Sequence, residues 1–148
     1  MKDKLQVVRK ALHYAKTPMM IAMVVTPLRF SLEVAGIPEV YIFLIGLLWL
    51  TLGFAVYWGI RMIDEKEPFM LLLVSLMLFS PVSRIPVFIL WWITKTWELG
   101  THYDIFDNWT QALVGQLFYG SLVQIIPGFM VGSIVLFIMK SRTRYSTN

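Results

Sequence analysis

The chain has 148 residues, of which 57% are hydrophobic and only 15% are charged, and it carries a formal net charge of +4 and no cysteine. Soluble domains are about 45–50% apolar and about 25% charged, and a small globule has too much surface to hide such an apolar excess. This composition excludes an ordinary soluble domain, and the lack of cysteine excludes disulfides, thiolate catalysis and cysteine-bound metal sites.

The first predicted element is a basic amphipathic helix over residues 2–16. Leu5, Val8, Leu12 and Ala15 recur at helical spacing, and lysine and arginine side chains occupy the opposite face. Such a helix lies on a membrane surface and is drawn to anionic lipid. We therefore expect membrane lipids as partners and no nucleic acid, for which the sequence shows no binding motif. No cleavable signal peptide is expected either, because the first apolar run starts late and no A-x-A-like site follows it.

Four apolar runs follow, and each is long enough to cross a bilayer as a helix. A hydrocarbon core of ~30 Å requires roughly 20 helical residues, and the runs lack the period-two alternation of a membrane barrel. The predicted fold is all-α: a polytopic membrane protein of four transmembrane helices, preceded by the interfacial helix, in a single domain over residues 1–148. The spans are expected at about 18–38, 40–60, 68–94 and 111–139.

Basic residues predict the orientation, because lysine and arginine beside short loops mark the cytoplasmic face. They gather in the N-terminal segment, in the turn between the second and third spans and in the C-terminal tail, whereas Lys95 is alone on the opposite side. We expect a multi-pass protein of a bacterial inner membrane with both termini in the cytoplasm. The residues that support this orientation are Lys2, Lys4, Arg9, Lys10, Lys16, Arg61, Lys66, Lys140, Arg142 and Arg144.

The loop between the third and fourth spans, residues 95–109, is the longest and is rich in aromatic and acidic residues. Its aromatic side chains fit a belt that anchors the bundle at the membrane boundary. His102, Asp104 and Asp107 lack any spacing typical of a metal site, so no metal is expected there.

Three charged residues fall inside the predicted spans: Arg29, Glu33 and Arg84. A charge at the bilayer centre costs about 2.5–3.5 kcal/mol on insertion scales, so such residues usually face a bundle interior or water. Arg29 lies roughly 14 Å before the end of its span at Pro38, and Arg84 lies roughly 17 Å before Lys95. Because the first and third spans run in the same direction, we expect the two arginines to meet at similar depth in the outer half of the membrane.

Similar sequences surround the two arginines: "MVVTPLR" over 23–29 and "MLFSPVSR" over 77–84. A proline inside a span frees a backbone carbonyl, and broken helices with polar residues at membrane depth often line a site. Thr26 and Ser80 precede these prolines, and Gln124 lies on a polar face of the fourth span. The sequence therefore predicts a small polar chamber, open to the outside, whose ligand-binding residues are Arg29, Arg84, Glu33, Gln124, Thr26 and Ser80.

The charges allow two interpretations. In the structural one, Arg29 and Glu33 neutralise each other across one helical turn, while Arg84 extends toward the membrane boundary or bonds the freed carbonyls. In the functional one, the chamber is net positive. It then favours a carboxylate, a phosphate or an anionic lipid head group, because the planar guanidinium fork matches such groups.

The leading functional hypothesis is a non-catalytic integral membrane protein that binds a small anion or an anionic amphiphile, as a transport or complex subunit. The alternative is a structural or scaffolding subunit of a larger membrane complex or a homo-oligomer. Gly128 and Gly132 form a G-x-x-x-G face, which favours close helix contact, first of all within the bundle.

A third hypothesis is a small enzyme acting on lipid or quinone through Glu33, His102 or the loop aspartates. No serine elbow, H-E-x-x-H motif or glycine-rich phosphate loop accompanies them, so the sequence assigns no catalytic residue and no cofactor.

Overall fold

The computed structural model of the chain describes residues 2–43 and 45–145, without the side chains of residues 2–4, 39 and 143–145. The tail 146–148 of the predicted domain and the side chains of Lys2, Lys4 and Arg144 therefore lie outside the described part. All regular structure in the described ranges is helical, which confirms the all-α prediction. The helices are α1 (Lys2–Val34), α2 (Glu39–Ile42), α3 (Leu47–Arg61), α4 (Pro68–Trp97), α5 (Trp109–Leu113), the π-helix η1 (Val114–Tyr119) and α6 (Gly120–Tyr145).

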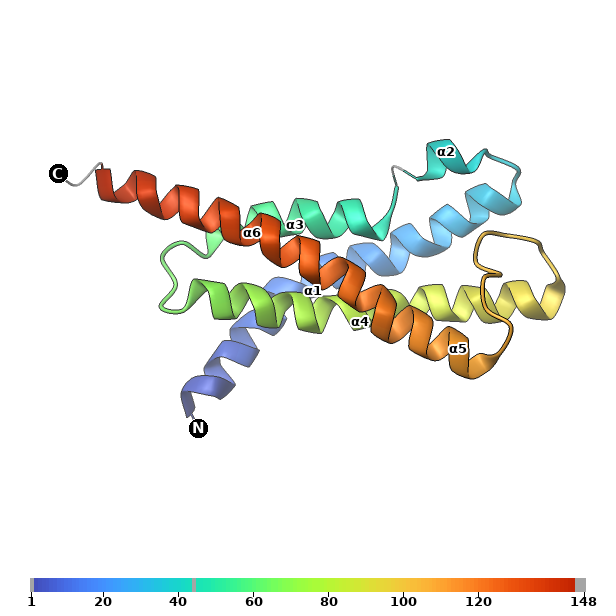
Figure 1. The fold of residues 1–148 in the computed structure, drawn as a ribbon, viewed down its shortest axis with the longest axis horizontal. Helices are drawn as coiled ribbons and strands as arrows, with labels where there is room; N and C mark the ends of the chain where they lie inside the picture. The colour runs from blue at the N-terminus through green and yellow to red at the C-terminus, as the bar shows by residue number, and fades with distance from the viewer. Residues whose placement is uncertain (1, 44, 146–148) are drawn as a thin grey trace.

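Four helical stretches are long and apolar enough to cross a membrane, as the sequence predicts. Figure 1 shows them alongside one another in one elongated bundle, with both termini and the turn over 62–67 at one end, which we call the terminal end. The short helix α2 and the loop over 98–108 lie at the opposite end, the loop end. The four stretches cover Leu5–Val34, Val40–Arg61, Pro68–Trp97 and Trp109–Arg142.

Helix α4 lies at the centre of the bundle, in contact with α1, α3 and α6. Its Leu72, Leu76 and Phe79 are fully buried, and Trp58 of α3 packs edge-on against Phe79 with ring centroids 6.3 Å apart. Membrane helices associate through van der Waals packing of this kind, since lipid tails are as apolar as leucine. This central position allows α4 to hold a polar side chain away from lipid.

Helices α3 and α6 approach each other closely at glycines. A Cβ atom added at Gly59 would lie 2.9 Å from the carbonyl oxygen of Gly132, and one added at Gly132 would lie 3.0 Å from that of Ala55. On the same face of α6, a Cβ added at Gly128 would lie 3.1 Å from a methyl group of Thr51. The G-x-x-x-G face is thus used inside the bundle, where small residues let helix backbones pack closely.

The predicted interfacial helix and the first span form one helix, since α1 runs without interruption through Pro18 and Pro27. Each proline removes a single backbone donor, and membrane helices tolerate such a loss when neighbouring groups satisfy the freed carbonyl. Ala11 and Ala15 are fully buried, whereas Leu12 is exposed. The N-terminal half of α1 therefore packs on the bundle through alanine, and its contact with a membrane surface stays a prediction.

The irregular backbone does not occur where the prolines predicted it. Helix α4 also runs through Pro81 and Pro86 without a break, so the two helices that carry the arginines are continuous, contrary to expectation. Near these prolines the Ser83 hydroxyl donates to the Ser80 carbonyl oxygen at 2.8 Å. The interruptions lie instead in the second stretch, before Leu47, and in the fourth, where η1 separates α5 from α6.

Candidate functional site

A cavity of about 300 Å³ lies at the loop end, between α1, the start of α3, α4 and η1, and the 98–108 loop supplies one of its walls. Its lining combines charged and polar side chains with the apolar residues at the start of α3. We call it the arginine pocket and define it by Arg29, Trp49, Arg84, His102, Tyr103 and Gln116.

Arg29 of α1 and Arg84 of α4 line this one cavity. The sequence predicts that they meet, because they lie at similar depth on helices that run in the same direction. The Nε atom of each is shielded from solvent and has no hydrogen-bond partner. Neither side chain takes part in an ion pair between described residues. Two permanent positive charges thus face one small space without a carboxylate of their own.

Arg84 packs on the backbone of Gly120, the first residue of α6. A Cβ atom added at Gly120 would lie 3.1 Å from both Nε and Cζ of Arg84, so any larger residue would press on the guanidinium group. The N–H of Gly120 also closes the π turn by donating to the Gly115 carbonyl. Such turns often occur at functional sites, and this one places Gln116 in the lining of the arginine pocket.

Glu33 does not pair with Arg29, although the two lie one turn apart on α1. Its carboxylate accepts a hydrogen bond from the backbone N–H of His102 at 2.5 Å and also contacts Nδ1 of the same residue. The expectation that Arg29 and Glu33 neutralise each other is therefore wrong, because the carboxylate is engaged by the loop. Glu33 reaches the arginine pocket only through His102, whose side chain lines it.

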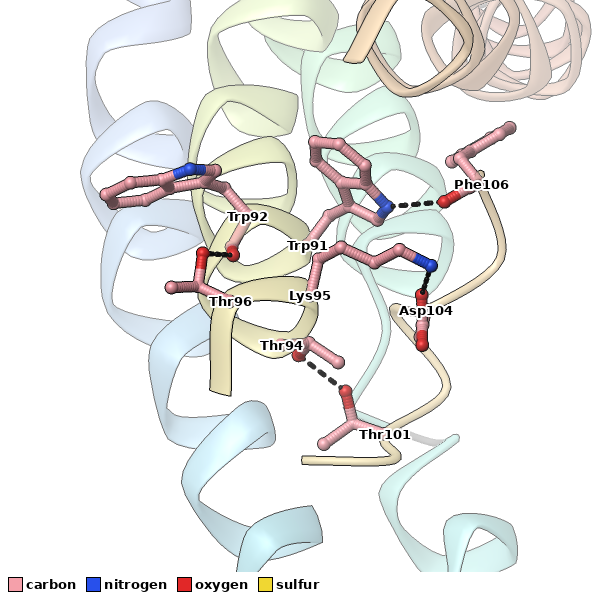
Figure 2. A network of polar contacts seen from close by, with 8 residues as sticks. All are labelled: Trp91, Trp92, Thr94, Lys95, Thr96, Thr101, Asp104 and Phe106. Atoms are coloured by element: carbon pink, nitrogen blue, oxygen red, sulfur yellow. Dashed lines mark hydrogen bonds and ion pairs between the residues drawn. The ribbon is translucent and has the colours of Figure 1, made fainter. Parts of the chain in front are cut away.

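The 98–108 loop is fixed to the end of α4 by contacts on both sides of His102 and Tyr103 (Figure 2). The contacts come from side chains that α4 presents along its last two turns, so the loop follows the helix closely. His102 and Tyr103 are thereby held at the wall of the arginine pocket. The hydrogen bonds join Thr94 Oγ1 to Thr101 Oγ1 at 2.8 Å, Lys95 Nζ to Asp104 Oδ1 at 3.1 Å and Trp91 Nε1 to the Phe106 carbonyl oxygen at 3.2 Å.

Tyr103 is only 3% exposed, and its ring packs edge-on against Phe30 with centroids 5.7 Å apart. Burial raises the pKa of Tyr103 to about 12, although the positive charges of Arg29 and Arg84 oppose this shift. The phenol therefore keeps its proton at neutral pH, and its hydroxyl adds a neutral hydrogen-bond donor to the lining of the arginine pocket.

The remaining predicted residues divide between the pocket and the bundle core. Thr26 lines the arginine pocket, and its buried hydroxyl has no hydrogen-bond partner. Ser80 and Gln124 are fully buried elsewhere, where Gln124 Oε1 accepts a hydrogen bond from Ser83 Oγ at 3.1 Å. Ser80 lies one helical turn, ~6 Å, closer to the terminal end than Arg84, and this offset keeps it out of the pocket lining.

Sequence analysis did not assign Trp49, Tyr103 or Gln116 to the site. Gln116 did carry a signal, because it is an amide inside an apolar run, as Gln124 is. Tyr103 was placed in an interfacial belt, but it is buried because the loop folds back over the helix ends. Trp49 enters the lining because the second apolar stretch is interrupted just before α3.

This arrangement is suited to an oxyanion. Guanidinium forks, a phenol and an amide present hydrogen-bond donors, and the planar geometry of a guanidinium fork matches carboxylate or phosphate oxygens. Within the described ranges no cluster of three or more histidine, aspartate or glutamate residues is placed to hold a metal ion. Comparison with known proteins adds nothing to this description: no family model, no curated protein and no solved structure matches the chain.

Proposed function

We propose that the chain is an integral membrane protein whose arginine pocket binds an oxyanion, namely a carboxylate or a phosphate, free or at the head of an amphiphile. The observation that supports it most strongly is the arrangement of Arg29 and Arg84. They come from separate helices, line one cavity and have no ion-pair partner among the described residues.

The lack of an ion-pair partner for the two arginines is energetically unfavourable. The effective penalty for taking an ion out of water is several kcal/mol, and it is recovered only if a partner of opposite charge is present. The carboxylate of Glu33, one helical turn from Arg29 on α1, is engaged by His102. A bound oxyanion would supply the missing negative charge, and charges kept at membrane depth usually serve function.

Membrane placement of the bundle rests on its four apolar helices. We place the terminal end in the cytoplasm of a bacterial cell, because the lysine and arginine residues beside the spans concentrate there. With this orientation the arginine pocket opens in the outer half of the membrane and receives its ligand from the outer side.

The lining also favours an amphiphile over a free anion. Phe43, Ile45 and Trp49 line the arginine pocket and are themselves exposed on the surface of the bundle. In a membrane these side chains would meet lipid tails, so an acyl chain could lie against them while its head group reaches the arginines. We therefore expect the protein to bind such an amphiphile as a subunit of a transport system or of another membrane complex.

The scaffolding alternative loses one of its arguments from the sequence. The G-x-x-x-G face of α6 is occupied by α3, so Gly128 and Gly132 offer no free contact to a second chain. A scaffolding role would have to use the exposed apolar faces, which a membrane helix presents to lipid in any case.

One contact favours a second candidate function, a small enzyme acting on a membrane lipid. A carboxylate that orients a histidine is the usual arrangement for a general base, and Glu33 and His102 make this contact at the wall of the arginine pocket. The purified His102→Ala variant should then lose an activity that the wild type shows against a panel of lipids or quinones. The enzyme hypothesis fails if the wild type turns over none of them.

The binding proposal is tested by titrating inorganic phosphate, and separately a phosphatidylglycerol, into the detergent-solubilised protein by calorimetry. Arg29→Gln and Arg84→Gln should each weaken binding by about 30-fold or more, since loss of one partner of a buried charge pair costs about 2–5 kcal/mol. Arg142→Gln, which removes an exposed arginine near the end of α6, is the matched control and should bind as the wild type does. Unchanged binding in folded Arg29→Gln and Arg84→Gln proteins would refute the proposal.

A further inference from the structure

A second hollow, of about 930 Å³, lies at the terminal end, far from the arginine pocket. It is formed between the N-terminal half of α1 and the C-terminal half of α3, and it extends to the turn that follows α3. Its side chains include three cations, a carboxylate and two tyrosines. We call it the basic groove and define it by Arg9, Lys10, Tyr14, Tyr57, Arg61 and Glu65.

The cations of the basic groove are not balanced by its one carboxylate. Lys10 Nζ lies 2.5 Å from Glu65 Oε2, and this ion pair links α1 to the turn after α3. Within the described part of the chain neither Arg9 nor Arg61 has an ion-pair partner. The Nε of Arg61 donates a long hydrogen bond, 3.4 Å, to the Tyr57 hydroxyl. Two guanidinium groups without an ion-pair partner among the described residues therefore line the groove from two helices.

Polarity falls along the basic groove toward the middle of the bundle. Thr17 lies ~12 Å along α1 from Arg9, and Phe54 lies ~10 Å along α3 from Arg61, at the standard helical rise. Thr17 and Phe54 line the inner part of the groove. The groove thus has a cationic end and an inner end with the aromatic ring of Phe54, in the order of a phospholipid head group and its acyl chains.

We infer that the basic groove binds one anionic phospholipid, with the phosphate between Arg9 and Arg61 and an acyl chain along Thr17 and Phe54. The inference rests on the membrane placement proposed above but not on ligand binding in the arginine pocket. Basic pockets between membrane helices recognise anionic head groups through charge and hydrogen bonds. The Lys10–Glu65 ion pair joins the two walls of the groove, which favours a defined site over diffuse attraction.

The test uses the full chain in detergent and native mass spectrometry with phosphatidylglycerol or with phosphatidylcholine of the same acyl chains. Because the arginine pocket should also hold this lipid, retention is scored in the Arg84→Gln background, where one phosphatidylglycerol should stay bound and phosphatidylcholine should not. Arg61→Gln and Arg9→Gln should each weaken its retention by roughly five- to tenfold, as expected for loss of one cation at a lipid phosphate. Arg61→Lys should restore part of the retention. Arg142→Gln, which removes the same charge outside the basic groove, should have no effect.

Three results would overturn the inference. Equal losses in Arg61→Gln and Arg142→Gln would show diffuse attraction in place of a site. Equal retention of the two lipids would show that charge is not recognised, and displacement of the lipid by inorganic phosphate would show a site for free anions. Arg84→Gln separates the two proposals, because it should abolish binding in the arginine pocket and leave lipid retention in the basic groove unchanged.

Discussion

Glu33 of α1 binds His102, 69 positions later in the chain, and leaves Arg29 on its own helix without a carboxylate. Two consequences come from this one contact. It ties the 98–108 loop to α1, and it keeps the lining of the arginine pocket positively charged. The path of the loop thus decides the charge of the site, although the arginines themselves lie on helices.

Glu33→Gln should strengthen oxyanion binding and weaken the fold. The glutamine keeps the shape of the side chain but removes a negative charge that repels an anion near Arg29. A hydrogen bond to a charged acceptor contributes about 1.5–3 kcal/mol, so the free energy of unfolding should fall by roughly 1–2 kcal/mol. Phosphate titration and denaturant unfolding in detergent measure the two effects. Asp107→Asn, at an exposed loop position, is the control. Weaker binding in Glu33→Gln would contradict this reading and place the carboxylate itself among the ligand contacts.

Arg84→Gln, studied without ligand, should be at least as stable as the wild type. Arg84 is half-buried, has no ion-pair partner among the described residues and keeps a shielded Nε without a hydrogen-bond partner, so loss of its charge should cost the fold nothing. Unfolding of ligand-free protein in detergent gives the comparison, with Arg142→Gln expected to change stability by less than about 0.5 kcal/mol. A clear loss of stability in Arg84→Gln would show that the guanidinium group holds the fold together.

Gly120→Ala should impair the site without weakening the helix. Its added Cβ would press on the Arg84 guanidinium, whereas alanine in a helix interior is favoured over glycine by roughly 0.5–1 kcal/mol. We expect oxyanion binding to weaken by about tenfold, as for one misplaced charge-assisted hydrogen bond. Gly53→Ala is the matched control, because a Cβ at Gly53 meets no atom within 4 Å. Equal binding by the two variants would show that Arg84 needs no support from Gly120.

The raised pKa of Tyr103 predicts a loss of stability at alkaline pH. Both states hold the phenolic proton below pH 10.0, and the unfolded chain releases it before the native protein does as the pH rises toward about 12. The native state then binds more protons, so the free energy of unfolding falls across this window. Tyr103→Phe should remove this part of the pH dependence, and Tyr41→Phe, at an exposed position, is the control. Identical alkaline profiles for the wild type and Tyr103→Phe would contradict the prediction.

The Thr94–Thr101 hydrogen bond should be visible in a double-mutant cycle. Thr101→Val leaves the buried Thr94 hydroxyl unpaired, and such a group costs about 1–3 kcal/mol, whereas the double valine variant removes both polar groups. We therefore expect the double variant to be more stable than the sum of the single changes predicts. Denaturant unfolding of the four proteins measures the difference, and strict additivity would show that the contact contributes nothing.

The sequence was sufficient for the helices and for the meeting of the two arginines at one level of the bundle. Four apolar runs of bilayer length leave few alternatives, and the fixed rise of a helix places Arg29 and Arg84 at comparable levels. Their meeting at one cavity follows from that geometry. Oxyanion binding by these residues stays a prediction.

Other features depend on contacts between distant parts of the chain, which the hydrophobic periodicity of the sequence does not predict. The prolines suggested breaks at Pro27 and Pro81, but a long membrane helix tolerates one missing hydrogen bond. The real interruption before Leu47 falls in the apolar run "FLIGLL", where Gly46 is the only helix-breaking signal. The Glu33–His102 contact depends on the path of a loop that is distant from Glu33 in sequence. The spacing of residues within one helix does not predict such a contact.

The π-helix η1 contains one residue more than a regular α-helix of the same length would, and this extra residue lies between α5 and α6. Since an α-helix rotates by about 100° per residue, deleting one residue from 117–119 would join the two helices and swing Gln116 by about 100° around the axis, away from Arg84. The apolar length would still cross a bilayer. A variant with this deletion would therefore keep the bundle and lose Gln116 from the lining of the arginine pocket.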